Sequence, residues 1–457
     1  MKHFRFVFVA VIAALIVTLG GTATSVRAQS RPFSSGFQVQ NLSTSEASAE
    51  IVFYNENGNQ GASVQATIPA SGSTTYAILP DSVPAGFNGS AVISSNQKVA
   101  AIVNLVSPDI SLSFGGEAYI GFESGSRNVS LPLLFKNFSG FNTFFNVQNV
   151  GSTTANVTVT YRGQGITGTV QETATIPPNA ARRFDQNANT QIPSNFFGSA
   201  TITSDQDIVA AVVQVGPTTV LAYNGFTEAS TEPYFPLINA NNSGFITGIS
   251  LQNAGTTDTE VTVSYSPTPG ITGNSPACTE TKTIPGNGGS AIFAVDAFRI
   301  SQPGENCADG GLFVGSARVT TNSANQPLVA VVNQLNNTTN KAGAYSSFNV
   351  TGATDTVVFP LIQDRVAGFF TGISIVNVGN TATTITCTYS PGGTTQVSTT
   401  IQPGGTFTPV QLNQISNSFN GSGVCRSNPA SNIIGIANQV RTTGTVDTFF
   451  VYEGLNN

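Results

Sequence analysis

The side chains that could do chemistry are scarce in this chain of 457 residues. It has four cysteines, Cys278, Cys307, Cys387 and Cys425, and a single histidine, His3. Nucleophilic triads and many catalytic metal sites need histidine as a base or a ligand, and one histidine at position 3 supplies neither. The cysteines therefore carry the remaining chemistry, either as disulfides or as thiolate ligands of zinc.

The acidic residues do not form an alternative site in the sequence. The segment 185–189 begins like a calcium loop, but Thr190 stands where glycine is required and Phe196 where a bidentate acid is required. The pattern predicts a polar loop. No two acids are clustered or repeated in the way a glycosidase would need. We therefore expect no enzyme activity, no metal and no cofactor.

The first 28 residues have the pattern of a secretory leader. Lys2 and Arg5 precede an apolar run from Phe6 to Leu19, and Val26-Arg27-Ala28 fits a signal-peptidase site. An uncleaved membrane anchor would need a longer apolar run. The sequence predicts cleavage after residue 28, a mature chain without histidine or membrane span, and a secreted, extracellular location that includes the cell surface.

Composition limits the class of partner. Only 9% of the residues are charged, and the formal net charge is −6. The leader holds three of the 17 basic residues and no acid, which makes the mature chain −9. A nucleic-acid partner would require a concentrated basic face, which is absent from the sequence. We expect the partners to be other protein subunits or polymers of the cell surface or matrix, with homo-oligomers among the candidates.

The chain contains four internal repeats, marked by two independent anchors. One anchor is a Gly-Ser pair before an apolar strand, with its glycine at Gly89, Gly198, Gly315 and Gly421. The other is an asparagine that closes an apolar strand, at Asn41, Asn149, Asn253 and Asn377. Both recur about every 105–125 residues, the size of one small domain. The predicted domains are 29–127, 128–231, 232–355 with an insertion, and 356–457.

Each repeat reads as a set of short strands. Apolar residues alternate with polar ones through Ile249 and Leu251, then through Val261, Val263 and Tyr265, with an Asn-Ala-Gly turn between. About seven such strands, separated by Gly, Pro and Asn turns, are typical of a β-sandwich. The fold class expected is all-β: four tandem immunoglobulin-like β-sandwich domains after a signal peptide.

The hairpin pattern Val-x-Asn-x-Gly followed by Val-x-Val-x-Tyr, as at Val147 to Tyr161, resembles tandem bacterial immunoglobulin-like surface repeats of the cell-adhesion-related type. The resemblance covers this hairpin in each repeat, and not the Gly-Ser strand or the final strand centred on Tyr119, Tyr223, Tyr345 or Tyr452. It implies an extracellular binding or scaffolding role. The four final tyrosines suit core packing better than a sugar-stacking role.

The cysteines fall in the last two repeats. Cys387 and Cys425 replace strand residues, which predicts a disulfide between neighbouring strands. Cys278 and Cys307 flank the insertion of the third repeat, and we expect them to bridge it and to delimit a partner-binding loop. A zinc site would need four thiolates that converge from two repeats, and export favours disulfides.

The start of the first repeat differs from the others. Repeats two to four open with an apolar segment, such as Leu131-Pro132-Leu133-Leu134, where the first has only Arg31-Pro32-Phe33-Ser34. If this segment is the first strand of a unit, the first repeat lacks most of it; if it is the last strand of the previous unit, the fourth repeat lacks it. In the first case, an incomplete sandwich edge at Pro32 and Phe33 is a candidate for strand addition by another chain. The alternative is that Pro32 and Phe33 cover the gap.

These features predict a secreted or cell-surface structural or adhesive protein, with self-assembly as one form of that role. Two alternatives stay open: an extracellular carbohydrate-binding module protein, and an accessory protein of a polymer hydrolase.

Overall fold

The computed structural model describes residues 5–9, 33–76, 79–84, 87–106, 115–294, 307, 310–323, 326–336, 338–441 and 447–456. The chain is all-β, as predicted, with several antiparallel sheets and one short 3-10 helix, η1 (Val350–Gly352), among the described residues. No helix in these ranges is long and apolar enough to cross a membrane. Most of the predicted leader lies outside the described residues, and its described part, 5–9, forms β1.

The strands fall into four groups, which we call units 1 to 4. Unit 1 holds β1 (Arg5–Val9), β2 (Ser34–Asn41), β3 (Ala47–Asn55), β4 (Gln60–Ile68), β5 (Ser73–Tyr76), β6 (Gly89–Ser95), β7 (Val99–Val106) and β8 (Gly116–Ile120). Unit 2 holds β9 (Ser126–Lys136), β10 (Asn142–Asn149), β11 (Ala155–Gly163), β12 (Val170–Ile176), β13 (Ala181–Asp185), β14 (Phe196–Val215) and β15 (Val220–Asn224).

The other two units repeat this order. Unit 3 holds β16 (Pro233–Ala240), β17 (Phe245–Asn253), β18 (Thr259–Pro267), β19 (Cys278–Ile284), β20 (Ser290–Phe293), β21 (Phe313–Thr321), β22 (Leu328–Asn336), β23 (Lys341–Ser346) and β24 (Phe348–Asn349). Unit 4 holds β25 (Thr356–Val366), β26 (Phe369–Asn377), β27 (Thr384–Ser390), β28 (Thr394–Val397), β29 (Thr406–Phe407), β30 (Phe419–Asn428), β31 (Ile433–Arg441), β32 (Phe449–Glu453) and β33 (Leu455–Asn456).

Units 1 and 3 each have two sheets of four main strands, whereas in unit 4 the pairing of β25 with β26 joins all strands into one nine-stranded sheet. In unit 1 they run β1-β6-β3-β4 and β5-β2-β7-β8. In unit 2 the long β14 belongs to both sheets, because it pairs with β9 and β11 and also with β10 and β15. The constant-type immunoglobulin order places the first two strands in one sheet with the fifth and fourth. In units 1 and 3 the first and second strands lie in different sheets, so the immunoglobulin topology implied by the resemblance is not shown.

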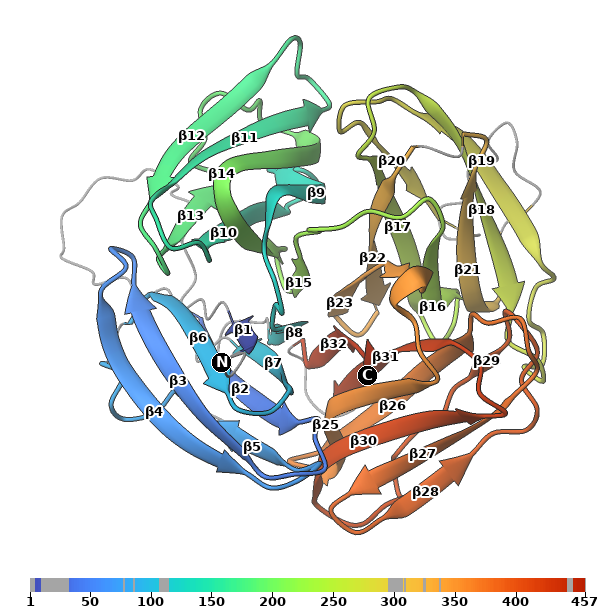
Figure 1. The fold of residues 1–457 in the computed structure, drawn as a ribbon. Helices are drawn as coiled ribbons and strands as arrows, with labels where there is room; N and C mark the ends of the chain where they lie inside the picture. The colour runs from blue at the N-terminus through green and yellow to red at the C-terminus, as the bar shows by residue number, and fades with distance from the viewer. Residues whose placement is uncertain are drawn as a thin grey trace.

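The four units form a closed ring rather than a row (Figure 1). Their last main strands, β8, β15, β23 and β32, gather at the centre, where each contacts the next and β32 contacts β8. Unit 4 therefore lies against unit 1, so the two ends of the repeat array meet. We call the line through the middle of these four strands the axis.

Apolar contacts continue from one unit to the next. Along β14, Ala210 and Val212 lie in the core of unit 2, whereas Ala211 and Val213 lie in the core of unit 1. The same holds around the ring, because Ile436 of unit 4 lies in the core of unit 3. These strands are nearly continuously apolar because both of their faces are buried.

The Gly-Ser anchor joins neighbouring units. A Cβ on Gly198 would lie 2.0 Å from the carbonyl oxygen of Arg162 on the adjacent strand, so only glycine fits this position. The next residue, Ser199, donates from Oγ to the carbonyl of Gly288 in unit 3 at 2.6 Å. Equivalent bonds run from Ser90 to Asn179 and from Ser316 to Gly404. The repeated motif therefore encodes the joint between units.

The asparagine anchor organises the first hairpin of each unit. Asn149 Nδ2 donates to the carbonyls of Thr153 and Ile176 at 2.8 and 2.9 Å, and its Oδ1 accepts from the Gly151 N–H. Asn41, Asn253 and Asn377 make the equivalent bonds within their units. All four are buried, and each satisfies backbone groups of the turn that would otherwise be unpaired.

The disulfides join the pairs expected from the sequence, Cys278 with Cys307 and Cys387 with Cys425. Cys387 faces Cys425 directly between β27 and β30. The partner-binding loop proposed between Cys278 and Cys307 begins with β19 and β20, and its segment 295–306 lies outside the described residues.

Candidate functional site: a pocket on the axis

A pocket of about 370 Å³ opens on the axis at the ends of β8, β15, β23 and β32. All four units contribute equivalent segments to its lining: 120–124, 224–228, 346–349 and 453–456. Concave sites of this size, built from several elements, are typical of ligand binding. The pocket exists because the ring closes.

The strand pattern explains which residues reach the pocket. In each of the four strands a buried tyrosine, Tyr119, Tyr223, Tyr345 or Tyr452, anchors the strand in its core, as the sequence predicted. Side chains alternate along a strand, so the next residue points to the opposite side. Those next residues, Ile120, Asn224, Ser346 and Glu453, all line the pocket.

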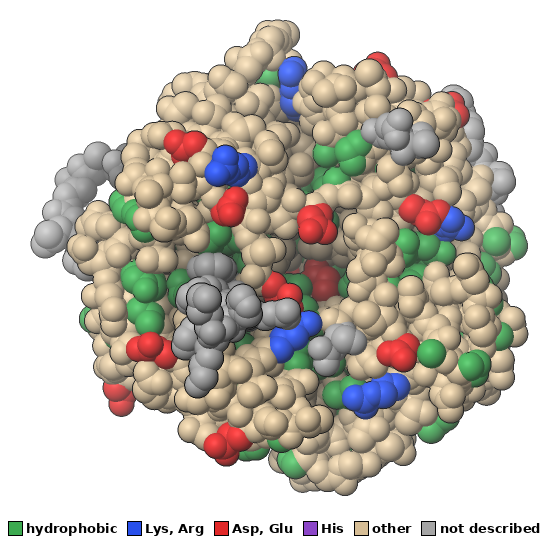
Figure 2. All heavy atoms as spheres, viewed as in Figure 1, with side chains coloured by type: hydrophobic (Ala, Val, Ile, Leu, Met, Phe, Trp, Pro, Cys, Tyr) green, Lys and Arg blue, Asp and Glu red, His purple; other side chains and the backbone are tan. Residues whose placement is uncertain are grey.

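The charged lining is entirely acidic. Glu123, Glu228 and Glu453 line the pocket, and no lysine or arginine of the described residues does so. Glu453 is buried, which raises the pKa of its carboxyl, and it accepts a hydrogen bond from the Ser346 N–H. Glu123 is exposed and lies 3.9 Å from Lys98, a contact that solvent weakens. Figure 2 shows acidic side chains around and within the hollow at the centre of the ring.

One further polar atom of the lining, Asn224 Oδ1, is buried without a hydrogen-bond partner among the described residues. The Asn224 amide is held by its other end, because Nδ2 donates to the carbonyl of Ile120 at 2.9 Å. Buried acceptors without partners are costly, at about 1–3 kcal/mol each, and such groups in native proteins point to a missing ligand or water.

The walls of the pocket are aromatic. Phe122, Phe226 and Phe348 occupy equivalent positions in units 1, 2 and 3, and Leu455 takes that place in unit 4. Aromatic faces attract cations, and carboxylates and amide oxygens accept hydrogen bonds from them. The lining is thus suited to a protonated amine or guanidinium attached to an apolar stem.

Comparison with known proteins gives no family. No family model matches the chain, and no curated protein matches it. A solved structure titled "Crystal Structure of Thermotoga maritima 1070" is 18% identical over 23% of this chain and 96% of its own, with a TM-score of 0.21. At that TM-score the likeness carries no argument about fold or function.

Two buried carboxyl groups join the four central strands through hydrogen bonds. Glu117 on β8 is fully buried and accepts from the backbone N–H groups of Ala118, Ala344 and Val451 at 2.8, 2.8 and 2.6 Å. Ala344 belongs to unit 3 and Val451 to unit 4, so one side chain links three units. Burial outweighs these hydrogen bonds and raises the pKa of Glu117.

Asp447 has the same role from unit 4. It accepts from the N–H groups of Ala342 at 3.2 Å and of Val220 and Phe449 at 3.3 Å. Burial raises the pKa of Asp447 to about 8. Burial also lowers the pKa of Lys341, whose Nζ donates to Thr448 Oγ1 at 2.9 Å.

The other sequence-predicted sites lie elsewhere. Among the described residues no group of three His, Cys, Asp or Glu side chains is placed to hold a metal ion. Asp185, from the loop considered for calcium, instead accepts from Arg183 and from the Asn187 N–H. Phe33 is buried and packs against Phe144 of unit 2, whereas Pro32 lies outside the described residues.

The sequence analysis did not find the axial pocket. Its residues come from the ends of the four tyrosine-centred strands, which are far apart in the sequence. The signal available was the segment after each tyrosine, as in Tyr223-Asn224-Gly225-Phe226, which recurs in every repeat after the Gly-Ser anchor. Only the ring shows that these segments meet.

Proposed function

We propose that the protein is a secreted adhesive protein that binds a lysine or arginine side chain of an extracellular protein in its axial pocket. The observation that carries the proposal is the lining: acidic residues, the unpartnered oxygen of Asn224 and three phenylalanines, with no basic residue among the described ones. A cationic head would satisfy the acceptors, and its alkyl stem would pack on the aromatic walls.

An adhesive role fits the ring better than a filament built end to end. In the joint between units 4 and 1, Gln38 donates to the carbonyl of Pro360, so the last unit is already covered by the first. The two disulfides suit an extracellular location. The low charge of the chain leaves the pocket as a distinct acidic feature.

The experiment is a calorimetric titration of residues 29–457 with N-acetyl-lysine methylamide and with its neutral isostere, N-acetyl-norleucine methylamide. We expect the lysine compound to bind and the norleucine compound to bind at least tenfold more weakly. Glu453→Gln should weaken lysine binding by a similar factor, because it removes the buried negative charge. Glu260→Gln, an exposed acid on β18, is the matched control and should have no effect.

Salt gives a second readout, because added NaCl should weaken an attraction between opposite charges. Equal binding of both compounds, or binding that Glu453→Gln does not change, would refute the proposal. If neutral oligosaccharides bind instead and Glu453→Gln abolishes their binding, the carbohydrate-binding alternative replaces the adhesive one.

A further inference from the structure

The first strand of a unit lies at the joint with the next unit and carries a Pro-Leu pair there. In unit 2 this strand is β9, which pairs with β14 with a shift of register around Pro132 and Leu133. Units 3 and 4 have Pro236-Leu237 on β16 and Pro360-Leu361 on β25, with the same shift. Each pair presents two consecutive backbone carbonyls to buried donors.

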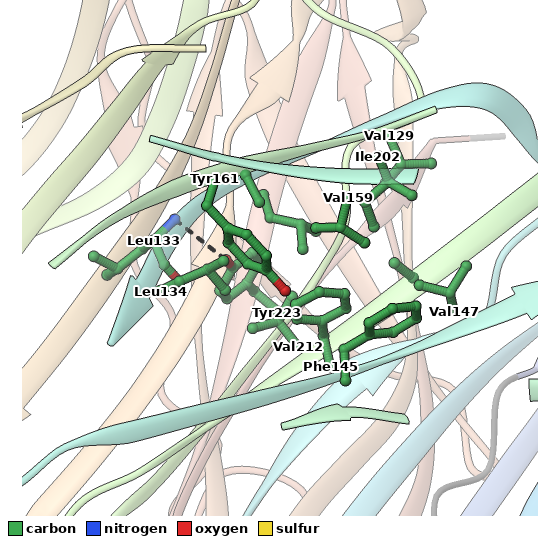
Figure 3. Close-up of a cluster of buried hydrophobic side chains, with 14 of the residues drawn as sticks. Val129, Leu133, Leu134, Phe145, Val147, Val159, Tyr161, Ile202, Val212 and Tyr223 are labelled. Atoms are coloured by element: carbon green, nitrogen blue, oxygen red, sulfur yellow. Dashed lines mark hydrogen bonds between the residues drawn. The ribbon is translucent and has the colours of Figure 1, made fainter. Parts of the chain in front are cut away.

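The leucine carbonyl accepts from the central tyrosine of the same unit. Tyr223 donates to the Leu133 carbonyl at 2.7 Å and accepts from the Leu133 N–H at 3.2 Å, and Figure 3 shows the two residues side by side in the core of unit 2. Tyr345 donates to Leu237 at 2.5 Å, and Tyr452 donates to Leu361.

The proline carbonyl accepts from the second strand of the next unit. Ser250 donates to Pro132 at 2.9 Å, and Ser374 donates to Pro236 at 2.9 Å. In the joint between units 4 and 1, Gln38 has this role toward the carbonyl of Pro360. Gln38, Ser250 and Ser374 each lie three residues before the anchor asparagine that ends their strand.

Unit 1 lacks both partners. Tyr119, the equivalent of Tyr223, is 1% exposed and its hydroxyl has no hydrogen-bond partner. Asn146, which lies three residues before Asn149 and thus corresponds to Ser250, is 6% exposed and its Nδ2 has no partner. These two unpaired groups belong to the same joint, between units 1 and 2. They mark the place where a Pro-Leu pair of carbonyls is missing.

The edge strand at this joint comes from the predicted leader. β1 pairs with β6 from Arg5 opposite Ser95 to Val9 opposite Ala91, in the position that β9 takes beside β14. Because the sequence predicts cleavage after residue 28, the secreted chain would lose β1. It would then leave the edge of β6 open beside the two unpaired groups.

We propose that this open edge is a binding slot for an extended segment of a different protein, which adds as an antiparallel strand beside β6. Two consecutive backbone carbonyls are what Tyr119 and Asn146 lack, and a polypeptide main chain supplies them. The three filled joints define the segment: an apolar residue, then Pro-Leu, then Leu or Ile. In a second copy, β9, β16 and β25 are already paired within their own units, so the donor is another protein.

The probe is a labelled peptide with the sequence of residues 127–136, titrated into residues 29–457 and followed by fluorescence anisotropy. We expect saturable binding of one peptide per chain, and none by a peptide with aspartate in place of Leu131 and Leu133. Asn146→Ala should weaken the peptide about three- to tenfold, the effect of one hydrogen bond. Ser250→Ala is the matched control, because its joint is already filled, and should leave the affinity unchanged.

A grafted variant of this protein gives a second test that remains decisive if the mature chain folds poorly. Residues 126–141 placed directly before Ser34 would supply the missing strand in cis. This chain should melt at a higher temperature than residues 29–457 and should no longer bind the peptide, and the same graft with Leu131→Asp should show neither effect. The slot is overturned if the peptide does not bind and the graft does not raise the melting temperature. It is also overturned if the aspartate peptide binds equally well. Neither readout depends on the axial pocket, so Glu453→Gln should not alter them.

Discussion

Glu117 gives the sharpest test of how the ring is held. Its carboxylate accepts three backbone N–H groups, two of them from other units, in a fully buried position. In Glu117→Gln one of the two acceptor oxygens is replaced by an NH₂ group, which faces backbone N–H groups and cannot accept from them. At least one backbone N–H therefore becomes unpaired. An unpaired buried donor costs about 1–3 kcal/mol. Glu117→Ala leaves the N–H groups of both Ala344 and Val451 unpaired, which costs roughly 2–6 kcal/mol.

These losses are large against a typical unfolding free energy of about 5–15 kcal/mol. We would measure guanidinium unfolding of both variants by circular dichroism. The midpoint should fall in the order wild type, glutamine variant, alanine variant. Glu123→Gln, an exposed acid at the pocket rim, is the control and should shift stability by no more than about 0.5 kcal/mol. An alanine variant as stable as the wild type would refute the role of Glu117 as a link between units.

Three further outcomes follow from the structure. The pKa of Asp447 is raised by burial from 3.8 to about 8, so its protonated form favours the folded state. The contribution of Asp447 to the free energy of unfolding should be complete below about pH 4 and be lost as pH rises toward 8, a change on the order of 5 kcal/mol. Chemical denaturation at several pH values should show a weaker pH dependence for Asp447→Asn than for the wild type. Gly198→Ala should lower the melting temperature sharply, because its Cβ would meet the Arg162 carbonyl, whereas Gly248→Ala, with no atom within 4 Å, should not. Replacing both Cys387 and Cys425 with valine opens a loop of 38 residues and should lower the free energy of unfolding in chemical denaturation by about 3–4 kcal/mol. A reduced wild type as stable as the oxidised wild type would contradict this.

Local features of the fold could be predicted from the sequence. Alternation of apolar and polar residues predicted the antiparallel hairpins, and the anchors at Asn149 and Gly198 predicted a repeating unit. Strand positions also predicted the Cys387–Cys425 pair. These features depend on residues close in sequence or aligned by repetition, so one chain is enough to detect them.

The ring could not be predicted in the same way. Ser199 and Gln38 bond to neighbouring units, yet in the sequence they look like ordinary polar strand residues. The apolar run 208–213 suggested a buried strand but not that its two faces belong to different cores. Glu117 carried no signal, because its partners are backbone groups of distant strands. The pocket depends on the ring and was missed for the same reason.

An incomplete edge of the first unit was predicted from the missing Pro-Leu segment before Phe33, and it stays a prediction, because β1 pairs with β6 at that edge in the structure. The structure adds the two unpaired groups, Tyr119 and Asn146, which give that gap a defined chemistry. Phe33 packs in the same joint, against Phe144. The boundaries predicted for the four units stay predictions, as do the leader cleavage and the extracellular location.

Closure of the ring is the central claim, because the axial pocket depends on it. Small-angle X-ray scattering of residues 29–457 tests it directly. A compact chain of this length should have a radius of gyration of about 22 Å. Four units in a row would give a radius on the order of 40 Å, since each has a radius of gyration near 13 Å. A value near 22 Å is the result the ring predicts, and a value near 40 Å would contradict it.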